Sequence, residues 1–260
     1  MSSTAAPRWK TAIESALSEY KNQTVIQIAT TDNTRPTPRV RSHIFRAFLS
    51  HPAHPARPLL LSSTDIRTPK VAQLTSPNSD SSNNAEIAWW IAGTQQQFRV
   101  LARVYIVPAP AHPLHAHFKR QLAASDAESG AGLALFPALA EWESQRTRTF
   151  AAMSAHMRAS WCRPTPGTPL ALSGGPEGAA RWPTRVPEPD RERMTEDEYA
   201  EAKRDWEKAL SNFALVVADP YEVDLVDLGG ERDRRWRFVK KYLKEENGEG
   251  WGWEEEELVP

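Results

Sequence analysis

The chain has little cysteine and almost no net charge. Its 260 residues include one cysteine, Cys162, which excludes an internal disulfide and is typical of a reducing compartment. The 32 lysines and arginines are balanced by 33 aspartates and glutamates, so the formal charge is −1. A chain with this balance has no overall field that attracts nucleic acid or an anionic membrane. We therefore expect neither as a partner.

Long apolar runs are also missing. No stretch approaches the about 20 residues that a membrane-spanning helix needs. The N-terminal segment has no apolar signal core, and its Glu14 and Glu19 argue against a mitochondrial presequence. Together with the single cysteine, these features predict a cytoplasmic protein. Hydrophobic residues make up 40% of the chain, which is enough to build a buried core.

What the chain does contain is a series of short β-branched and apolar segments, separated by turn chemistry such as that in 32–38 and 76–85. They predict strands over 24–30, 40–49, 59–63, 86–92, 97–108, 213–220 and 223–228. Apolar residues at helical spacing predict helices over 9–20, 70–74, 137–160 and 194–210. Strands joined mostly by hairpins, with flanking helices, predict a mainly β fold of the α+β class, built as a closed or half-closed antiparallel barrel.

Two proline-rich segments are predicted to be irregular. HPAHPARP (51–58) is interpreted as a surface loop. Residues 164–193 are rich in proline and glycine and lack apolar periodicity, so we expect either a loop ordered by its contacts or a mobile insertion. The chain is then a single domain, 1–260, that contains this insertion.

The segment TDIRTPK (64–70) follows a predicted strand and carries chemistry that suits an anion. Thr64 and Thr68 supply hydroxyl donors, Arg67 and Lys70 supply cations, and a helix beginning at Pro69 offers free backbone N–H groups. An ordinary capped helix with surface charges explains the same letters and is the commoner case. On these residues alone, both interpretations stay open.

Three further polar residues lie on predicted strands. Arg41 and Arg46 have an odd separation, so a regular strand places them on opposite faces, and they reach one ligand only if the strand bends. Otherwise they are two solvent-facing arginines. Gln97 begins its strand, where a glutamine hydrogen-bonds the edge of a planar heterocycle or, more often, satisfies a turn.

Other conspicuous residues favour structural interpretations. The histidines of HPLHAHF (112–118) lie in a predicted loop and lack a complete set of four ligands, so no zinc or other metal site is expected. Cys162 has no indicated catalytic partner and is interpreted as a small buried residue. The basic segment 232–241 is expected to form a salt-bridged surface with the nearby EEEE run.

The order of the segments is more informative than any one of them. RSHIFRAF, LSSTDIRTPKVAQL, AEIAWWI and QQFRVLARV are followed by RASWCRPTPG, FALVVADPYEVDL and a terminal tryptophan ahead of LVP. From Trp9 to Pro260 this series resembles the FMN-binding proteins of the pyridoxamine 5'-phosphate oxidase-like family. Within that family it is similar to a mostly uncharacterised branch from cyanobacteria and fungi.

The resemblance implies a split β-barrel that forms a homodimer, with two FMN molecules at the subunit interface. By position, Arg41 and Arg46 match the family's basic residues around the flavin. The strand-to-helix segment that holds the FMN phosphate is matched by Ser63, Thr64, Arg67, Thr68 and Lys70.

Two more parts of the chain match the family's flavin site. Gln97 matches the glutamine that faces the flavin from the other strand. The C-terminal tail that approaches the cofactor is matched by Trp253 and by the arginines Arg232, Arg234 and Arg235, of which Arg235 is the preferred candidate.

The sequence also departs from the family's oxidases of pyridoxine 5'-phosphate. Those enzymes hold the substrate's phosphate with a tyrosine, an arginine and a serine on the middle helix, a constellation that residues 141–161 lack. Their tail motif, similar to RLHDR, appears here only as ERDRRW (231–236). FMN binding therefore transfers better than the substrate does, and no catalytic residue is assigned.

These features predict an FMN-dependent oxidoreductase, in which a substrate gives hydride to FMN and oxygen reoxidises it. Pyridoxamine or pyridoxine 5'-phosphate is the candidate substrate. The alternatives are a non-catalytic FMN-binding or carrier protein, an FMN oxidoreductase for an unrelated substrate, and an interaction module without a cofactor.

Overall fold

The computed structural model describes residues 5–32, 37–76, 83–245 and 248–260. The turn predicted in 32–38 and the loop predicted in 76–85 fall largely outside these ranges. Among the described residues, no helix has the length and apolar character to cross a membrane.

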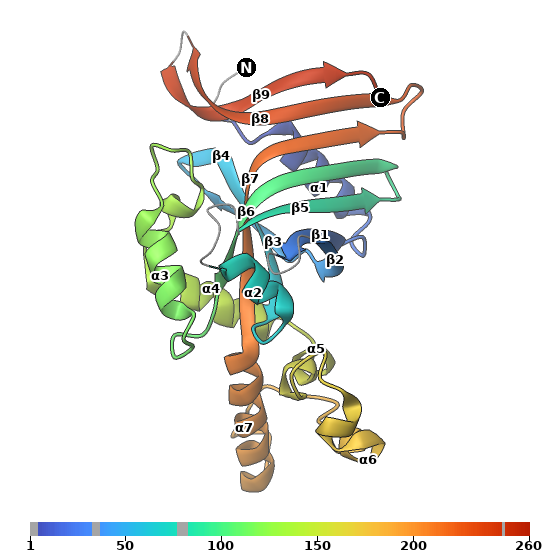
Figure 1. Ribbon diagram of the computed structural model, residues 1–260, viewed down its shortest axis with the longest axis vertical. Coiled ribbons are helices and arrows are strands. Elements are labelled where there is room, and N and C mark those ends of the chain that lie inside the picture. The colour runs from blue at the N-terminus through green and yellow to red at the C-terminus, as the bar shows by residue number, and fades with distance from the viewer. Residues whose placement is uncertain (1–4, 33–36, 77–82, 246–247) are drawn as a thin grey trace.

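An antiparallel sheet forms the body of the molecule (Figure 1). Its strand order is β2-β1-β5-β6-β7-β4-β3, with β8 paired to β7 and β9 paired to β8. The strands are β1 (Val25–Asp32), β2 (Thr37–Ile44), β3 (Ala47–His51), β4 (His54–Asp65), β5 (Asn84–Ile91), β6 (Gln96–Val107), β7 (Phe213–Asp227), β8 (Arg234–Glu245) and β9 (Gly248–Leu258).

The long strand β7 connects the two parts of the sheet. It pairs with β6 on one side, while on the other its first part pairs with β4 and its second part with β8. Within the described residues, no pairing joins the outer strands β2, β3 and β9 into a closed barrel. The coarser prediction of a mainly β, antiparallel fold with flanking helices is confirmed.

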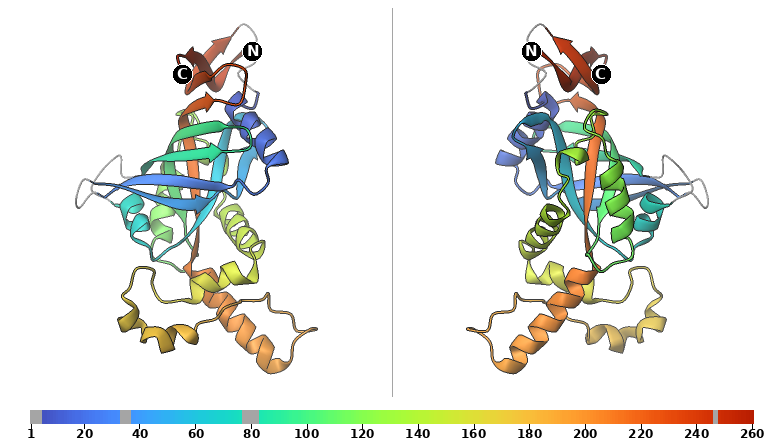
Figure 2. Two further views of the ribbon diagram at one scale, coloured as in Figure 1. Left: turned by 90° about the vertical axis from the view of Figure 1, so that its right-hand side faces the viewer. Right: turned by 90° about the vertical axis from the view of Figure 1, so that its left-hand side faces the viewer.

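Helices flank the sheet and extend beyond one end of it (Figures 1 and 2). The helix α7 continues away from the sheet where β7 begins, and α5 and α6 lie at the same end. The helices are α1 (Arg8–Glu19), α2 (Pro69–Thr75), α3 (His115–Ala124), α4 (Leu139–Ala151), α5 (Ala155–Ala159), α6 (Gly175–Ala180) and α7 (Glu196–Asn212). Short 3-10 turns cover Leu133–Leu135, Ser160–Cys162 and Leu170–Ser173.

Two apolar cores follow from the alternation of side chains along β6. Phe98, Val100 and Val104 face the first core, which α1 closes with Trp9. Further along the strand, Tyr105 and Val107 face the second core, which includes Trp142 of α4. The end of β6 is thus buried on both faces, and the two cores share one rigid sheet.

The strand predicted over 40–49 is in fact two strands. β2 pairs with β1 and ends at Ile44, whereas β3 begins at Ala47 and pairs with β4. The chain turns between them, because Phe45 N–H bonds Thr24 O and Arg46 N–H bonds Leu61 O. This is the bend that two arginines at an odd separation require to approach one site.

Other boundaries also differ from the predictions. The segment HPAHPARP is not a loop, because β4 begins at His54 and accommodates Pro55 and Pro58. Residues 213–228 form mainly one strand, β7, which continues through Pro220. The predicted helix over 137–160 breaks after Ala151, and Ser154 caps the N-terminus of α5 by accepting the N–H of Met157.

Three further predicted segments contain the helices α3, α6 and α7. The histidine segment that was predicted as a loop contains the start of α3, at His115. Within 164–193 the chain forms the short helix α6 and the turn Leu170–Ser173, and is otherwise irregular. The predicted helix over 194–210 is α7, and it begins with a capping box in which Thr195 and Glu198 accept from each other's backbone N–H.

Candidate functional site

A cavity of about 260 Å³ opens where β4 ends and α2 begins. One wall comes from β2 and includes His43, and the opposite wall comes from α5 and the turn after it, including Met157 and Trp161. Between these walls lie five of the residues predicted from the sequence, namely Arg46, Ser63, Thr64, Thr68 and Lys70.

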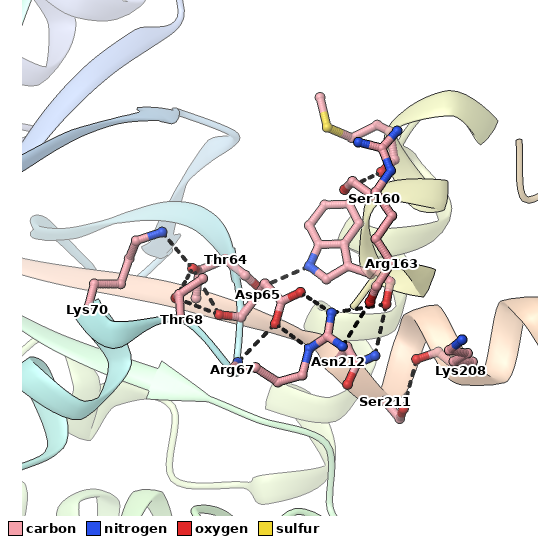
Figure 3. A network of polar contacts seen from close by, with 12 residues as sticks. Thr64, Asp65, Arg67, Thr68, Lys70, Ser160, Arg163, Lys208, Ser211 and Asn212 are labelled. Carbon is pink, nitrogen blue, oxygen red and sulfur yellow. Dashed lines mark hydrogen bonds and ion pairs between the residues drawn. The ribbon is translucent and has the colours of Figure 1, made fainter. Parts of the chain in front are cut away.

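Hydroxyl groups and Lys70 form a connected network at the floor of the cavity (Figure 3). Lys70 Nζ donates to Thr64 Oγ1 at 3.2 Å, and Thr64 Oγ1 lies 3.3 Å from Thr68 Oγ1. Thr68 occupies the N-cap position ahead of Pro69, as predicted, but its hydroxyl donates to Asp65 O at 2.7 Å instead of capping the helix. Since α2 has only 7 residues, the chemistry of the cavity rests on side chains more than on the helix terminus.

Among the described residues, two cations line this cavity without an ion pair, and the Asp65 carboxylate that also lines it is paired with Arg67. Arg46 Nε and Nη2 each lie 3.3 Å from Ser63 Oγ, and burial lowers the pKa of Arg46. Burial, and secondly the charge of Arg41, lowers the pKa of Lys70, while Asp65 acts in the opposite direction. In the described part of the chain, neither cation forms an ion pair. Desolvated positive charges of this kind are stabilised when an anion enters.

Arg67 comes from the same segment but serves a different contact. Its guanidinium forms an ion pair with Asp65 at 2.6 Å and donates to Arg163 O at 3.0 Å and to Trp161 O at 3.4 Å. In Figure 3 it reaches toward Arg163, whereas Lys70 reaches toward Thr64. Arg67 is not among the residues that line the cavity. It ties the end of β4 to the wall that Trp161 belongs to.

Arg41 lies behind the cavity. Its guanidinium donates to Thr30 Oγ1 at 2.6 Å and to Gln73 Oε1 at 2.8 Å, which joins β1 to α2. It does not line the cavity, but its charge acts on both Lys70 and His43. Burial, and then the charge of Arg39, lowers the pKa of Arg41.

The remaining predicted residues lie elsewhere on the sheet. Gln97 and Arg235 both pair with Val226, from opposite sides, so the three share one face. Gln97 is exposed, and Arg235 forms an ion pair with Asp224 at 2.8 Å. Trp253 packs edge-on against Trp9 and donates its Nε1–H to Ala56 O.

The other tail arginines are on the surface. Arg232 is exposed, and Arg234 pairs with Glu257 at 2.8 Å. Similar pairs join Lys241 to Glu254 and Arg8 to Glu255, so the prediction of a salt-bridged surface is confirmed. None of these residues lines the cavity at the end of β4.

Sequence reasoning missed much of the cavity wall. His43 was overlooked because it lies between the two arginines of RSHIFR that carried the argument. The signal was available, since a histidine in an apolar strand needs a polar partner. The wall residues Met157, Ser160, Trp161 and Pro166 were not predictable, because only the break after α4 brings them to β4.

Other candidate chemistry is not supported at this site. Among the described residues, no group of three or more histidines, cysteines or carboxylates is arranged to hold a metal. Cys162 is buried, as predicted, and its Sγ donates to Asp205 O. Burial is the main cause that raises the pKa of this thiol, so it stays protonated.

Comparison with known proteins finds a family model that matches the N-terminal part of the chain. Residues 6–108 match the sequence model described as the FMN-binding domain of pyridoxamine 5'-phosphate oxidase. The matched range contains both cavity strands, β2 and β4, and helix α2. Among proteins of curated function, none matches the sequence significantly.

A solved structure shares the fold over most of the chain. A pyridoxamine 5'-phosphate oxidase-related, FMN binding protein from Nostoc punctiforme is 20% identical, with a TM-score of 0.61, and the match covers 99% of this chain and 100% of that one. PhzG from Burkholderia lata, solved with tetrahydrophenazine-1-carboxylic acid, is 14% identical with a TM-score of 0.49, covering 98% of this chain and 93% of that one. The resemblance stated from sequence is therefore confirmed over residues 6–108, which match the FMN-binding, pyridoxamine 5'-phosphate oxidase-like family model.

Proposed function

We propose that the cavity at the end of β4 holds the phosphate of FMN. Lys70 and Arg46 provide the positive charge, and the hydroxyls of Ser63 and Thr64 provide donors, while Thr68 lines the cavity with its hydroxyl donating to Asp65 O. Arg41 supports the site from behind by adding positive potential near Lys70. Arg67 contributes indirectly, because its contacts hold the wall of the cavity in place.

The observation that carries this proposal is the pair of desolvated cations without an ion pair among the described residues. Burying such charges in a folded chain is unfavourable unless an anion pairs with them. Each charge-assisted contact to a phosphate oxygen is worth about 1.5–3 kcal/mol. A dianionic phosphate matches these two cations in charge, and its oxygens accept hydrogen bonds from them and from the neighbouring hydroxyls.

We further propose that a homodimer with a split-barrel fold completes the site. A volume of about 260 Å³ is below the about 300–1,000 Å³ of typical ligand pockets, so it suits the phosphate end of FMN and not the whole molecule. Gln97 and Arg235 share one face of the sheet, and we propose that they reach the flavin of a partner subunit. For Trp253 we propose an indirect role, because it holds β9 against α1 and β4 through Trp9 and Ala56.

When bound, FMN supplies hydride transfer, and the residues of the chain bind and orient it. We propose that the protein is a flavin-dependent oxidoreductase resembling pyridoxamine or pyridoxine 5'-phosphate oxidase, with oxygen as the acceptor. The alternatives are an FMN oxidoreductase with another substrate and a non-catalytic FMN carrier. The single buried thiol fits a reducing compartment, and we propose a cytoplasmic location.

The visible spectrum of the purified protein tests FMN binding first. We expect a yellow protein that releases FMN on denaturation, and an apoprotein that quenches added FMN at one site per chain. Turnover is then tested with pyridoxamine 5'-phosphate under air, with hydrogen peroxide as the readout. Bound FMN without turnover would exclude this substrate, whereas a colourless protein with no affinity for FMN would overturn the proposal itself.

A further inference from the structure

His43 is a buried histidine that lines the proposed phosphate cavity. Its side chain is 6% exposed and projects from β2, two residues after Arg41. Nδ1 lies 3.2 Å from Ser62 Oγ, whereas Nε2 is buried without a hydrogen-bond partner among the described residues. Buried polar atoms are nearly always paired, so an unpaired one beside a cavity indicates a missing partner.

The bonds of Ser62 determine which nitrogen of His43 carries the proton. A serine hydroxyl has one proton, and Ser62 Oγ donates it to Ile44 O at 2.8 Å. Ser62 Oγ is therefore the acceptor toward His43, and Nδ1 is the donor. A neutral imidazole with its proton on Nδ1 presents a lone pair at Nε2, so the missing partner is a hydrogen-bond donor.

The surroundings keep this imidazole neutral. Burial is the main cause that lowers the pKa of His43 to about 3, and the charges of Lys70 and Arg41 act in the same direction. The carbonyl of Ser63 opposes them more weakly. A second cation beside Lys70 is thus disfavoured, and His43 is an acceptor in a cavity whose other polar groups are mostly donors.

We propose that Nε2 of His43 accepts a hydrogen bond from a hydroxyl of the ligand next to its phosphate, and so selects a polyol phosphate. This inference rests on the proposed function, since FMN is a ligand of this class and its ribityl chain carries hydroxyls beside the phosphate. A deprotonated phosphate oxygen cannot be the partner, because an acceptor does not bond another acceptor. The cations then recognise the phosphate, and His43 recognises the chain attached to it.

The test compares two ligands and two proteins. One ligand is FMN, and the other is an FMN analogue in which a plain pentyl chain replaces the ribityl chain. The proteins are the wild-type chain and His43→Phe, whose ring has a similar shape and no acceptor. Affinity is measured by quenching of flavin fluorescence, and circular dichroism checks that the variant is folded.

We expect His43→Phe to weaken FMN binding about 5-fold and to leave the affinity for the analogue unchanged. His43→Gln, which keeps an acceptor oxygen, retains part of the preference for FMN. Nitrogen-15 NMR of the imidazole gives a readout that does not depend on activity. The ligand-free protein shows Nε2 without a proton, and FMN shifts this signal more than the analogue does.

Several results would overturn the inference. Equal weakening of both ligands would mean that His43 acts through Lys70 or through packing, and no change in either would mean that it makes no ligand contact. A protonated Nε2 in the neutral protein would make it a donor to the phosphate instead. If the wild-type chain binds neither flavin, the proposed function fails together with this inference, whereas binding of both without the preference for hydroxyls refutes the role of His43 alone.

Discussion

The cavity at the end of β4 and the outer face around Val226 both carry residues predicted to surround one flavin, but they are built differently. In the cavity, hydroxyls and two cations lie within one chain, and the cations have no ion pair among the described residues. On the outer face, Gln97 is exposed and Arg235 is already paired with Asp224. A single chain can therefore form an anion site in the cavity. The outer face around Val226 needs the surface of a second subunit to form a site.

The same contrast occurs inside TDIRTPK. Lys70 has a lowered pKa, and within the described part of the chain it donates only to Thr64, so its charge is poorly compensated. Three residues earlier, Arg67 is bonded to Asp65, Trp161 and Arg163. Two cations that look equivalent in the sequence thus differ in role, since one is available to a ligand and the other holds the fold. Substitutions can separate these roles.

The largest effect is expected for Arg67→Met, on stability. The side chains of Arg67 and Asp65 are 22% and 10% exposed, so the substitution leaves a mostly buried carboxylate without its partner. We expect the free energy of unfolding to fall by about 3 kcal/mol, measured by urea denaturation. FMN affinity of the folded fraction is expected to change little. A loss of FMN affinity without a loss of stability would mean that Arg67 contacts the ligand directly.

Lys70→Met is expected to weaken FMN binding and to leave stability almost unchanged, which is the opposite of Arg67→Met. It removes a charge-assisted contact worth about 1.5–3 kcal/mol, so the Kd for FMN rises by about 10-fold to 150-fold. Stability is expected to be unchanged or slightly higher, because the folded state disfavours the Lys70 charge. Fluorescence titration and urea denaturation of the same samples give both values, and Arg67→Met is the matched control. Unchanged FMN affinity would place the phosphate elsewhere.

A pH series tests whether His43, in the cavity, stays neutral in the folded protein. Its pKa is lowered to about 3 in the folded state, so between pH 6.5 and pH 3 the unfolded chain binds the additional proton. Stability contributed by the neutral imidazole is therefore full above pH 6.5 and is lost as the pH falls. By pH 5 the wild-type chain is expected to lose about 2 kcal/mol more than His43→Phe, from urea denaturation at each pH. Parallel curves for the two proteins would show that His43 titrates normally.

Some parts of the site could be predicted from the sequence, and others could not. Thr68 and Pro69 were placed correctly, because the start of a helix is encoded in neighbouring residues. The bend after Ile44, which brings Arg46 to Ser63, depends on bonds to Thr24 and Leu61 that no local pattern reveals. The proline-rich start of β4 was misread for a similar reason, since its pairing comes from β3 and β7. Local chemistry was thus readable from the sequence, and contacts between distant segments were not.

The smallest effect is expected for Gln97→Ala. This substitution tests the outer face around Val226, where one chain alone does not form a complete site. A neutral hydrogen bond contributes about 1 kcal/mol, so FMN affinity should fall about 5-fold if Gln97 reaches the flavin of a partner subunit. Gln145→Ala, on α4, is the matched control and should leave the affinity unchanged.

Sedimentation of both proteins establishes whether they are dimers, and mixed dimers of two variants then give the decisive test. Heterodimers of Gln97→Ala with Lys70→Met should contain one site with both defects and one with neither, because each site would take Lys70 from one subunit and Gln97 from the other. Two weakened sites, one with the Gln97 defect alone and one with the Lys70 defect alone, would instead mean that Gln97 and Lys70 of the same chain act on one flavin.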